Sequence, residues 1–143
     1  SFMYAAKSAL AQYKKINTES ALEGASPHQL IQMLINGALD RLSQARGAIQ
    51  RGETAQKGLL IGKAVSILGG LQDSLDKSAD EQITENLDNL YDYMQRRLLD
   101  ANLKNDVSIL DEVSGLLLTI KEGWDAIAPI PAPIIEQEQA QID

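Results

Sequence analysis

The placement of proline constrains this chain more than any other feature. The 143-residue sequence holds four prolines: Pro27 stands alone, and Pro129, Pro131 and Pro133 cluster near the end. The long stretch between them contains no residue that would break a helix. Its apolar residues recur every three or four positions, which is the period of an amphipathic α-helix. The sequence therefore predicts an all-α protein.

Four long helices are predicted in this stretch. Ser26-Pro27-His28-Gln29 is a capping box with Pro at the first helical position, so the first helix begins there and runs to about Arg51. The others are expected at about 54–78, 80–102 and 105–127. Helices of matched length, joined by tight connections, must alternate in direction. We predict an antiparallel four-helix bundle over residues 26–128.

Two segments flank the bundle. Residues 3–16 are amphipathic but too short for a stable isolated helix, so we expect a short N-terminal helical segment that caps the bundle. We assign residues 3–128 to one helical domain. Residues 129–143 form a Pro-containing acidic tail, which we interpret as a flexible appendage. Its apolar part, 130–135, is a hypothetical occupant of an apolar groove.

Charge and composition narrow the classes of function. The 20 acidic and 13 basic residues give a net charge of −7, which argues against a nucleic-acid binder and against a basic membrane-surface binder. The absence of cysteine and the single histidine argue against thiolate catalysis and a zinc site. No apolar run approaches the roughly 20 residues that span a bilayer, and no leader sequence is recognised. We expect a cytoplasmic protein without membrane insertion.

No catalytic group of residues is evident in the sequence. We find no nucleophile beside a base, no metal-ligand cluster and no phosphate-binding loop. His28 lies in the first turn of a helix, where an exposed side chain is expected. Asp111 and Glu112 lie near a helix start, where acidic residues favour the helix dipole. We expect a protein that is not an enzyme and needs no metal or cofactor.

Two features suggest a bound partner. Eight of the ten glycines fall inside the predicted helices, where each costs around 1 kcal/mol relative to alanine. This suggests that a neighbouring helix or a bound chain approaches the backbone closely. The second feature is an excess of apolar residues beyond one core-facing stripe: Met33, Ile35, Leu39, Leu59, Ile67, Leu99, Leu103, Ile109, Leu116 and Leu118.

Two residue groups of the third helix allow more than one interpretation. Tyr91 either packs in the core beside Leu87 or lines a partner groove, while Tyr93 is expected outside the core. The adjacent pair Arg96-Arg97 is either a solvated face or a site for a carboxylate or main-chain carbonyls of a bound peptide.

Three sequence blocks resemble the FliS family of flagellin-specific export chaperones. The first is Ser26-Pro27-His28-Gln29-Leu30-Ile31 with Met33-Leu34 and Gly37-Ala38. The second is Leu90-Tyr91-Asp92-Tyr93-Met94 with Arg96-Arg97-Leu98 and Ala101-Asn102. The third, Leu110-Asp111-Glu112-Val113 through Leu116-Leu117 to Trp124, is similar to the last helix of the family.

The resemblance implies a cytoplasmic chaperone that binds the disordered C-terminal segment of flagellin. Such a protein prevents premature polymerisation of flagellin and assists its export by the flagellar type III secretion system. The export apparatus is a second implied partner, and a co-chaperone or regulatory protein is left open. In the family the N-terminal segment can cover part of the flagellin surface until the client displaces it, and Leu10 and Tyr13 match its apolar and aromatic positions.

The candidate partner contacts combine apolar and polar side chains. The apolar candidates are Leu10, Tyr13, Ile31, Leu34, Ile35, Leu90, Tyr91 and Met94. The polar candidates are Asn86, Asn89, Arg97 and Asn102. The alternative to a flagellin client is a self-associating helical bundle, so a monomer or a weak homodimer is expected.

Overall fold

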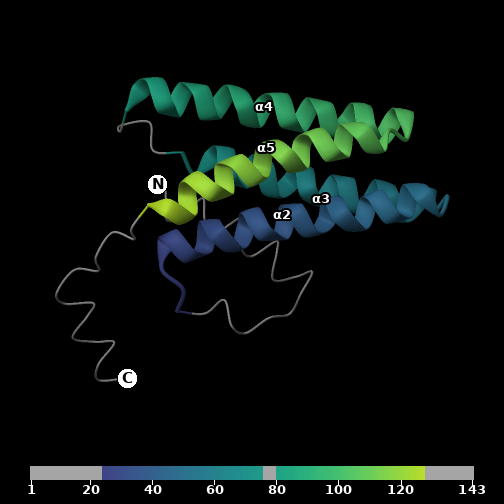
Figure 1. Ribbon diagram of the computed structural model, residues 1–143, viewed down its shortest axis with the longest axis horizontal. Helices are drawn as coiled ribbons and strands as arrows, with labels where there is room; N and C mark the ends of the chain where they lie inside the picture. The colour runs from purple at the N-terminus through teal and green to yellow at the C-terminus, as the bar shows by residue number, and fades with distance from the viewer. Residues whose placement is uncertain (1–23, 76–79, 128–143) are drawn as a thin grey trace.

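The computed structural model describes residues 24–75 and 80–127, and in these ranges the chain forms four helices (Figure 1). They are α2 (Pro27–Gln50), α3 (Thr54–Asp73), α4 (Glu81–Lys104) and α5 (Val107–Ala126). α2 packs against α3 and α5, and α4 packs against the same two helices. The predicted antiparallel four-helix bundle is confirmed. The predicted cap segment 3–16 and the tail 129–143 lie outside the described residues.

Side-chain caps begin three of the four helices. The predicted capping box is present, because the Gln29 backbone N–H donates to Ser26 Oγ (3.2 Å) and the Ser26 N–H donates to Gln29 Oε1 (3.0 Å). Asp80 accepts from two backbone N–H groups at the start of α4, and Asp106 accepts from Ser108 at the start of α5. These caps satisfy backbone donors that the first turn of a helix leaves unpaired.

Two predicted helix ends were wrong. α3 ends at Asp73 rather than near residue 78, because the Ser74 hydroxyl donates to the Leu71 carbonyl (2.7 Å) and closes the last turn. α4 continues to Lys104 rather than Asn102, and Asn105 ends it in a left-handed conformation with φ of 54°. Asn tolerates this conformation better than most residues do.

The C-terminal end of α4 is held by a buried lysine of α3. The Lys57 ammonium donates to the backbone carbonyl of Asn102 (2.9 Å) and to Asn105 Oδ1 (2.6 Å). The side chain is only 6% exposed. A cation at a helix C-terminus interacts favourably with the helix dipole, so this contact stabilises the end of α4.

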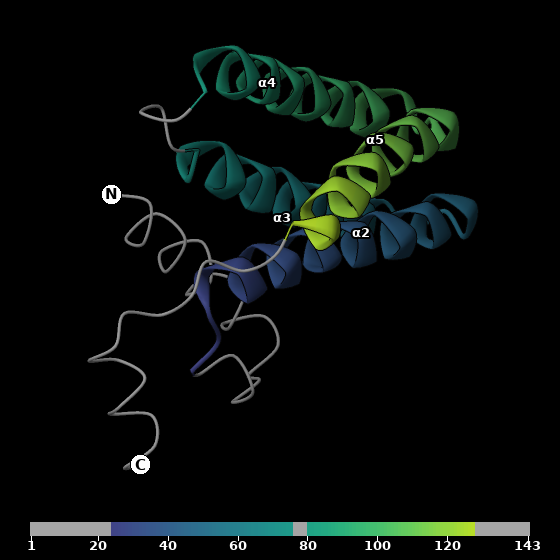
Figure 2. The ribbon, with the colours of Figure 1, turned by 60° about the vertical axis from the view of Figure 1, so that its left-hand side comes forward.

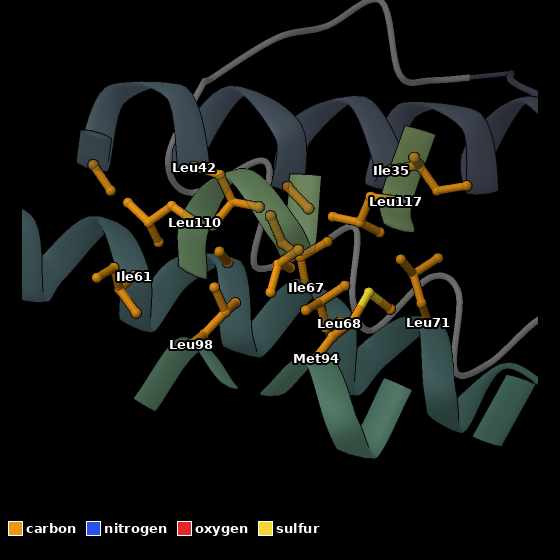
Figure 3. Packing of buried hydrophobic residues seen from close by; sticks show 14 of the residues in the cluster. Ile35, Leu42, Ile61, Ile67, Leu68, Leu71, Met94, Leu98, Leu110 and Leu117 are labelled. Atoms are coloured by element: carbon orange, nitrogen blue, oxygen red, sulfur yellow. The ribbon is translucent and has the colours of Figure 1, made fainter. Parts of the chain in front are cut away.

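Side chains from all four helices converge on one apolar core (Figure 3). The contribution is unequal, because eight of the buried apolar residues come from α2 and only four from α4: Tyr91, Met94, Leu98 and Ala101. The core interpretation of Tyr91 is confirmed, and burial raises the pKa of its hydroxyl to about 12. α5 also contributes four, so α4 and α5 are the helices that contribute least to the core.

The predicted apolar excess is only partly correct. Ile35, Ile67 and Ile109 are buried in the core, so placing them outside the core stripe was wrong. The large exposed side chains among the predicted excess residues are Leu59, Leu99, Leu103 and Leu118.

The interpretation that a neighbouring helix approaches the helical glycines closely was wrong at several positions. A Cβ added at Gly62, Gly115 or Gly123 would meet no atom within 4 Å. At Gly69 the nearest neighbour is the side-chain oxygen of Gln95 at 3.6 Å, which is ordinary contact. At these positions no neighbouring backbone requires glycine.

Candidate partner-binding face

α5 is tied to α2 at two places along its length. Near its start, Arg46 of α2 donates to both carboxylate oxygens of Asp111, at 2.9 and 3.2 Å. Near its end, the Trp124 indole N–H donates to the His28 carbonyl (3.0 Å), and the two rings stack with centroids 4.9 Å apart. His28 is consequently buried, and the expected exposure was wrong.

α5 is tied to α4 by a group that we call the clasp, formed by Tyr93, Arg97 and Glu112. The Tyr93 hydroxyl and the Arg97 guanidinium donate to the two oxygens of Glu112, at 2.6 and 2.8 Å. These donors, Tyr93 first, lower the pKa of the Glu112 carboxyl. Asp111 and Glu112 thus have specific partners, and the dipole role expected for them was wrong because no acidic residue lies in the first turn of α5. Arg97 also pairs with Asp100 at 3.4 Å.

Apolar side chains replace polar ones beyond the clasp. We define the α4–α5 face as the incompletely buried apolar side chains Ile83, Leu87, Leu90, Leu116 and Ile120. On α4, Leu90 and Ile83 lie about two and four turns before the clasp arginine. On α5, Leu116 and Ile120 lie about one and two turns after the clasp glutamate. Because side chains spaced in this way share one side of a helix, the two rows lie on the facing sides of α4 and α5.

The α4–α5 face is open to solvent. Ile83 is 58% exposed, and the other four side chains are partly buried against the core. No residue of α4 before Tyr91 is buried. Figures 1 and 2 show α4 and α5 close together near the loop that joins them and spread apart toward the start of α4. The open space at Gly123, on the same side of α5, agrees with this spread.

The structure places the predicted apolar contacts at different depths. Leu90 lies on the α4–α5 face, where a partner can reach it. Five others are core residues with at most 5% of their surface exposed: Ile31, Leu34, Ile35, Tyr91 and Met94. In this conformation their side chains are not accessible to a partner. Leu10 and Tyr13 lie outside the described residues.

The predicted polar contacts do not form one group. Asn86 and Asn89 are exposed on the N-terminal half of α4, beside Leu90. Arg97 belongs to the clasp. Asn102 lies about 18 Å from Leu90 along the helix axis, and its Oδ1 is buried near Gly58 of α3 without a hydrogen-bond partner.

Three residues of this face, Ile83, Leu87 and Ile120, were neither among the predicted partner contacts nor in the predicted apolar excess, whereas Leu116 belongs to that excess. The available signal was the spacing of apolar residues from Arg97 on one helix and from Glu112 on the other. That signal has meaning only once these two residues are known to pair.

Within the described residues, the candidate site is the apolar α4–α5 face and not a cluster of metal-ligating side chains. No three metal-ligating side chains gather among residues 24–75 and 80–127. None of the helices in those ranges is long and apolar enough to cross a membrane. A helical bundle with an open apolar face between two of its helices belongs to the class of protein-binding bundles.

Comparison with known proteins identifies the family. Residues 9–131 match the model of the family described as "Flagellar protein FliS". The chain is 52% identical over 126 residues to the flagellar secretion chaperone FliSB of Pseudomonas aeruginosa, covering 88% of this chain and 99% of that protein. It is 46% identical over 128 residues to the flagellar secretion chaperone FliS of Salmonella typhimurium, covering 89% and 94%. The chain belongs to the FliS family.

The similarity extends to a more distant bacterium. The flagellar secretion chaperone FliS of Bacillus subtilis is 32% identical over 106 residues, which cover 74% of this chain and 78% of that protein. FliS is a chaperone family and not an enzyme family, in agreement with the prediction from the sequence.

Proposed function

We propose that this protein binds the C-terminal segment of flagellin in the cytoplasm, prevents its premature polymerisation and assists its export through the flagellar type III system. The names of its relatives support the general role in flagellar secretion. The observation that carries the flagellin proposal is the open α4–α5 face. An apolar segment of a disordered client would bury side chains there that the bundle itself leaves exposed.

Calorimetric titration with a peptide from the C-terminal region of flagellin of the same bacterium tests this proposal. We expect saturable one-to-one binding with a large negative heat-capacity change, because ordering the peptide on the face buries apolar surface. A peptide of the same composition in scrambled order is the control. Absence of binding by the folded protein would refute the flagellin proposal.

A second titration addresses the N-terminal segment. If residues 3–16 act as an intramolecular competitor through Leu10 and Tyr13, a variant that lacks them should bind the peptide more tightly than the full chain. Equal affinities would remove the competitor role and leave client binding untouched.

Self-association remains a second candidate, because Leu99 and Leu103 are 59% and 81% exposed on one side of α4. Side chains four residues apart on a helix lie next to each other, so the two leucines offer a small apolar surface to a second copy. Sedimentation over a range of concentrations, without any client, tests this role. A species of constant monomer mass would exclude it.

A further inference from the structure

A polar network joins α3 to α4 on the other side of α4 from the clasp. The side-chain nitrogen of Gln72 donates to Oδ1 of Asp88 (2.8 Å) and to Oδ1 of Asp92 (2.9 Å). The side-chain oxygen of Gln72 accepts from Gln95 Nε2 (2.9 Å), which also donates to the Tyr91 carbonyl (3.2 Å). One side chain of α3 thus holds more than one turn of α4.

This network acts where the apolar core does not. The buried residues of α4 begin at Tyr91, so before that point only the partly buried Leu87 and Leu90 pack against the core. Asp88 belongs to this unburied part, and Gln72 donates to its backbone carbonyl (3.3 Å) as well as to its carboxylate. Gln72 therefore contacts α4 just beside Leu90 of the α4–α5 face.

α5, which lies across the α4–α5 face from α4, is held in place by contacts that do not involve Gln72. α5 is held by α2 through Asp111 near its start and through Trp124 near its end. With α5 fixed in this way, the width of the face depends on what holds the N-terminal half of α4. The clasp limits the width at one end only, because Tyr93 and Arg97 lie at the closed end of the face.

We propose that Gln72 is the positioning residue that draws the N-terminal half of α4 toward α3 and so keeps the α4–α5 face open. The identity of the ligand that binds the face rests on the function proposed above. The positioning of α4 by Gln72 rests only on the hydrogen bonds of the network. Gln72 contributes a donor where two carboxylates one turn apart need one, and it touches no client itself.

Substitutions that change the charge at position 72 test the role of the network. Gln72→Glu keeps the shape of the side chain but places a third carboxylate at hydrogen-bond distance from Asp88 and Asp92, where like charges repel. Gln72→Lys places an ammonium between the same two carboxylates and should keep α4 in place. Ser66→Glu adds the same negative charge as Gln72→Glu at an exposed position of α3 and serves as the matched control.

The absence of cysteine permits a direct measurement of the width of the face. Cysteines introduced at the exposed positions Glu85 of α4 and Glu122 of α5 would be the only two in the chain, so both can carry spin labels. Pulsed electron paramagnetic resonance then gives the distance distribution across the face. A second pair, at exposed Ser43 of α2 and at Glu122, reports the α2–α5 distance as an internal control.

We expect Gln72→Glu to shift or broaden the 85–122 distribution and leave the 43–122 distribution unchanged. Its affinity for the flagellin peptide should fall about tenfold. Gln72→Lys and Ser66→Glu should keep the distribution and the affinity of the parent protein. Lowering the pH toward about 4, where an ordinary glutamate becomes protonated, should narrow the Gln72→Glu distribution again.

Each outcome separates the two proposals. An unchanged 85–122 distribution in folded Gln72→Glu, or an equal change in Gln72→Lys, overturns the positioning role. A shifted distribution with no peptide binding by the parent protein supports the positioning role and refutes the flagellin proposal. Should Gln72→Glu fail to fold at neutral pH, Gln72→Leu removes the same hydrogen bonds without the added charge, and an unchanged distance there overturns the role equally.

Discussion

Two leucines of α4 provide a direct test of which surface binds the client. Leu90 and Leu98 are the same residue type on the same helix, about two turns apart. Leu98 is 0% exposed within the core, whereas Leu90 is partly exposed on the α4–α5 face. Replacing each with alanine removes the same atoms from two different environments, so the pair separates a role in stability from a role in binding.

The expected magnitudes follow from these environments. Leu98→Ala leaves a cavity in the core and should destabilise the protein by about 2–5 kcal/mol, which corresponds to a decrease in Tm of roughly 6–15 °C for a domain of this size. Leu90→Ala should cost about 1 kcal/mol or less, because its side chain is only partly removed from water. If Leu90 becomes buried under the client, the variant should lose about 1–2 kcal/mol of binding free energy, or roughly five- to thirtyfold in Kd.

The assay is thermal unfolding of each variant together with calorimetric titration of the flagellin peptide below the lower Tm. We expect Leu98→Ala to change mainly the Tm and Leu90→Ala to change mainly the Kd. The reasoning is refuted if Leu90→Ala lowers the Tm as much as Leu98→Ala while its affinity equals that of the parent protein. That result would make Leu90 a core residue and leave the α4–α5 face without a functional role.

Four further variants test other parts of the structure. Because Arg46 lowers the pKa of Asp111, the stability from this pair is complete above the unfolded-state pKa near 4 and is lost as the pH falls from there through the lower folded-state pKa. Arg46→Met should therefore weaken the dependence of the unfolding free energy on pH in this acidic range, as measured by urea unfolding at a series of pH values. Lys57→Met removes two hydrogen bonds of a buried ammonium and should cost about 2 kcal/mol in urea unfolding; unaltered stability would show that the contact is not stabilising. Gly62→Ala should stabilise the bundle by up to about 1 kcal/mol in thermal unfolding, whereas Gly52→Ala, at φ of 70°, should destabilise it; a stabilised Gly52→Ala would contradict this.

Helix starts were predictable and some helix ends were not. The capping box at Ser26 is a local signal, because the residues that make it are three apart in the sequence. The end of α3 has no such signal. Leu75 continues the apolar period beyond Asp73, and the helix stops where the Ser74 hydroxyl bonds to the Leu71 carbonyl and the backbone N–H groups of Ser74 and Leu75 close the last turn. The sequence predicts that the last helix starts near Asn105 or Asp106; Asp106 caps α5, whereas the left-handed backbone of Asn105 ends α4.

The candidate site was less predictable than the fold because it depends on contacts between distant residues. Periodicity identifies the inward side of each helix, and it correctly placed Leu34, Met94 and Leu98 on that side. It cannot tell which inward positions stay partly exposed, because this depends on how far α4 and α5 spread. The hydrogen bonds of Gln72 to Asp88 cross 16 residues and that of Trp124 to His28 crosses 96, so no short pattern contains them.

The open face links the stability of the bundle to the binding of a client. Partly exposed apolar side chains such as Leu90 and Ile120 contribute only part of the roughly 1.5–3 kcal/mol that complete burial of a large apolar side chain provides. Two groups of polar contacts offset this loss: the clasp, which joins α4 to α5 at the closed end of the face, and the Gln72 network, which joins α4 to α3. The Gln72 network also keeps the face from closing on itself, so the apolar surface stays accessible to another chain. A segment that covers the face would restore the missing burial, and any such ligand must raise the free energy of unfolding of the bundle as it binds.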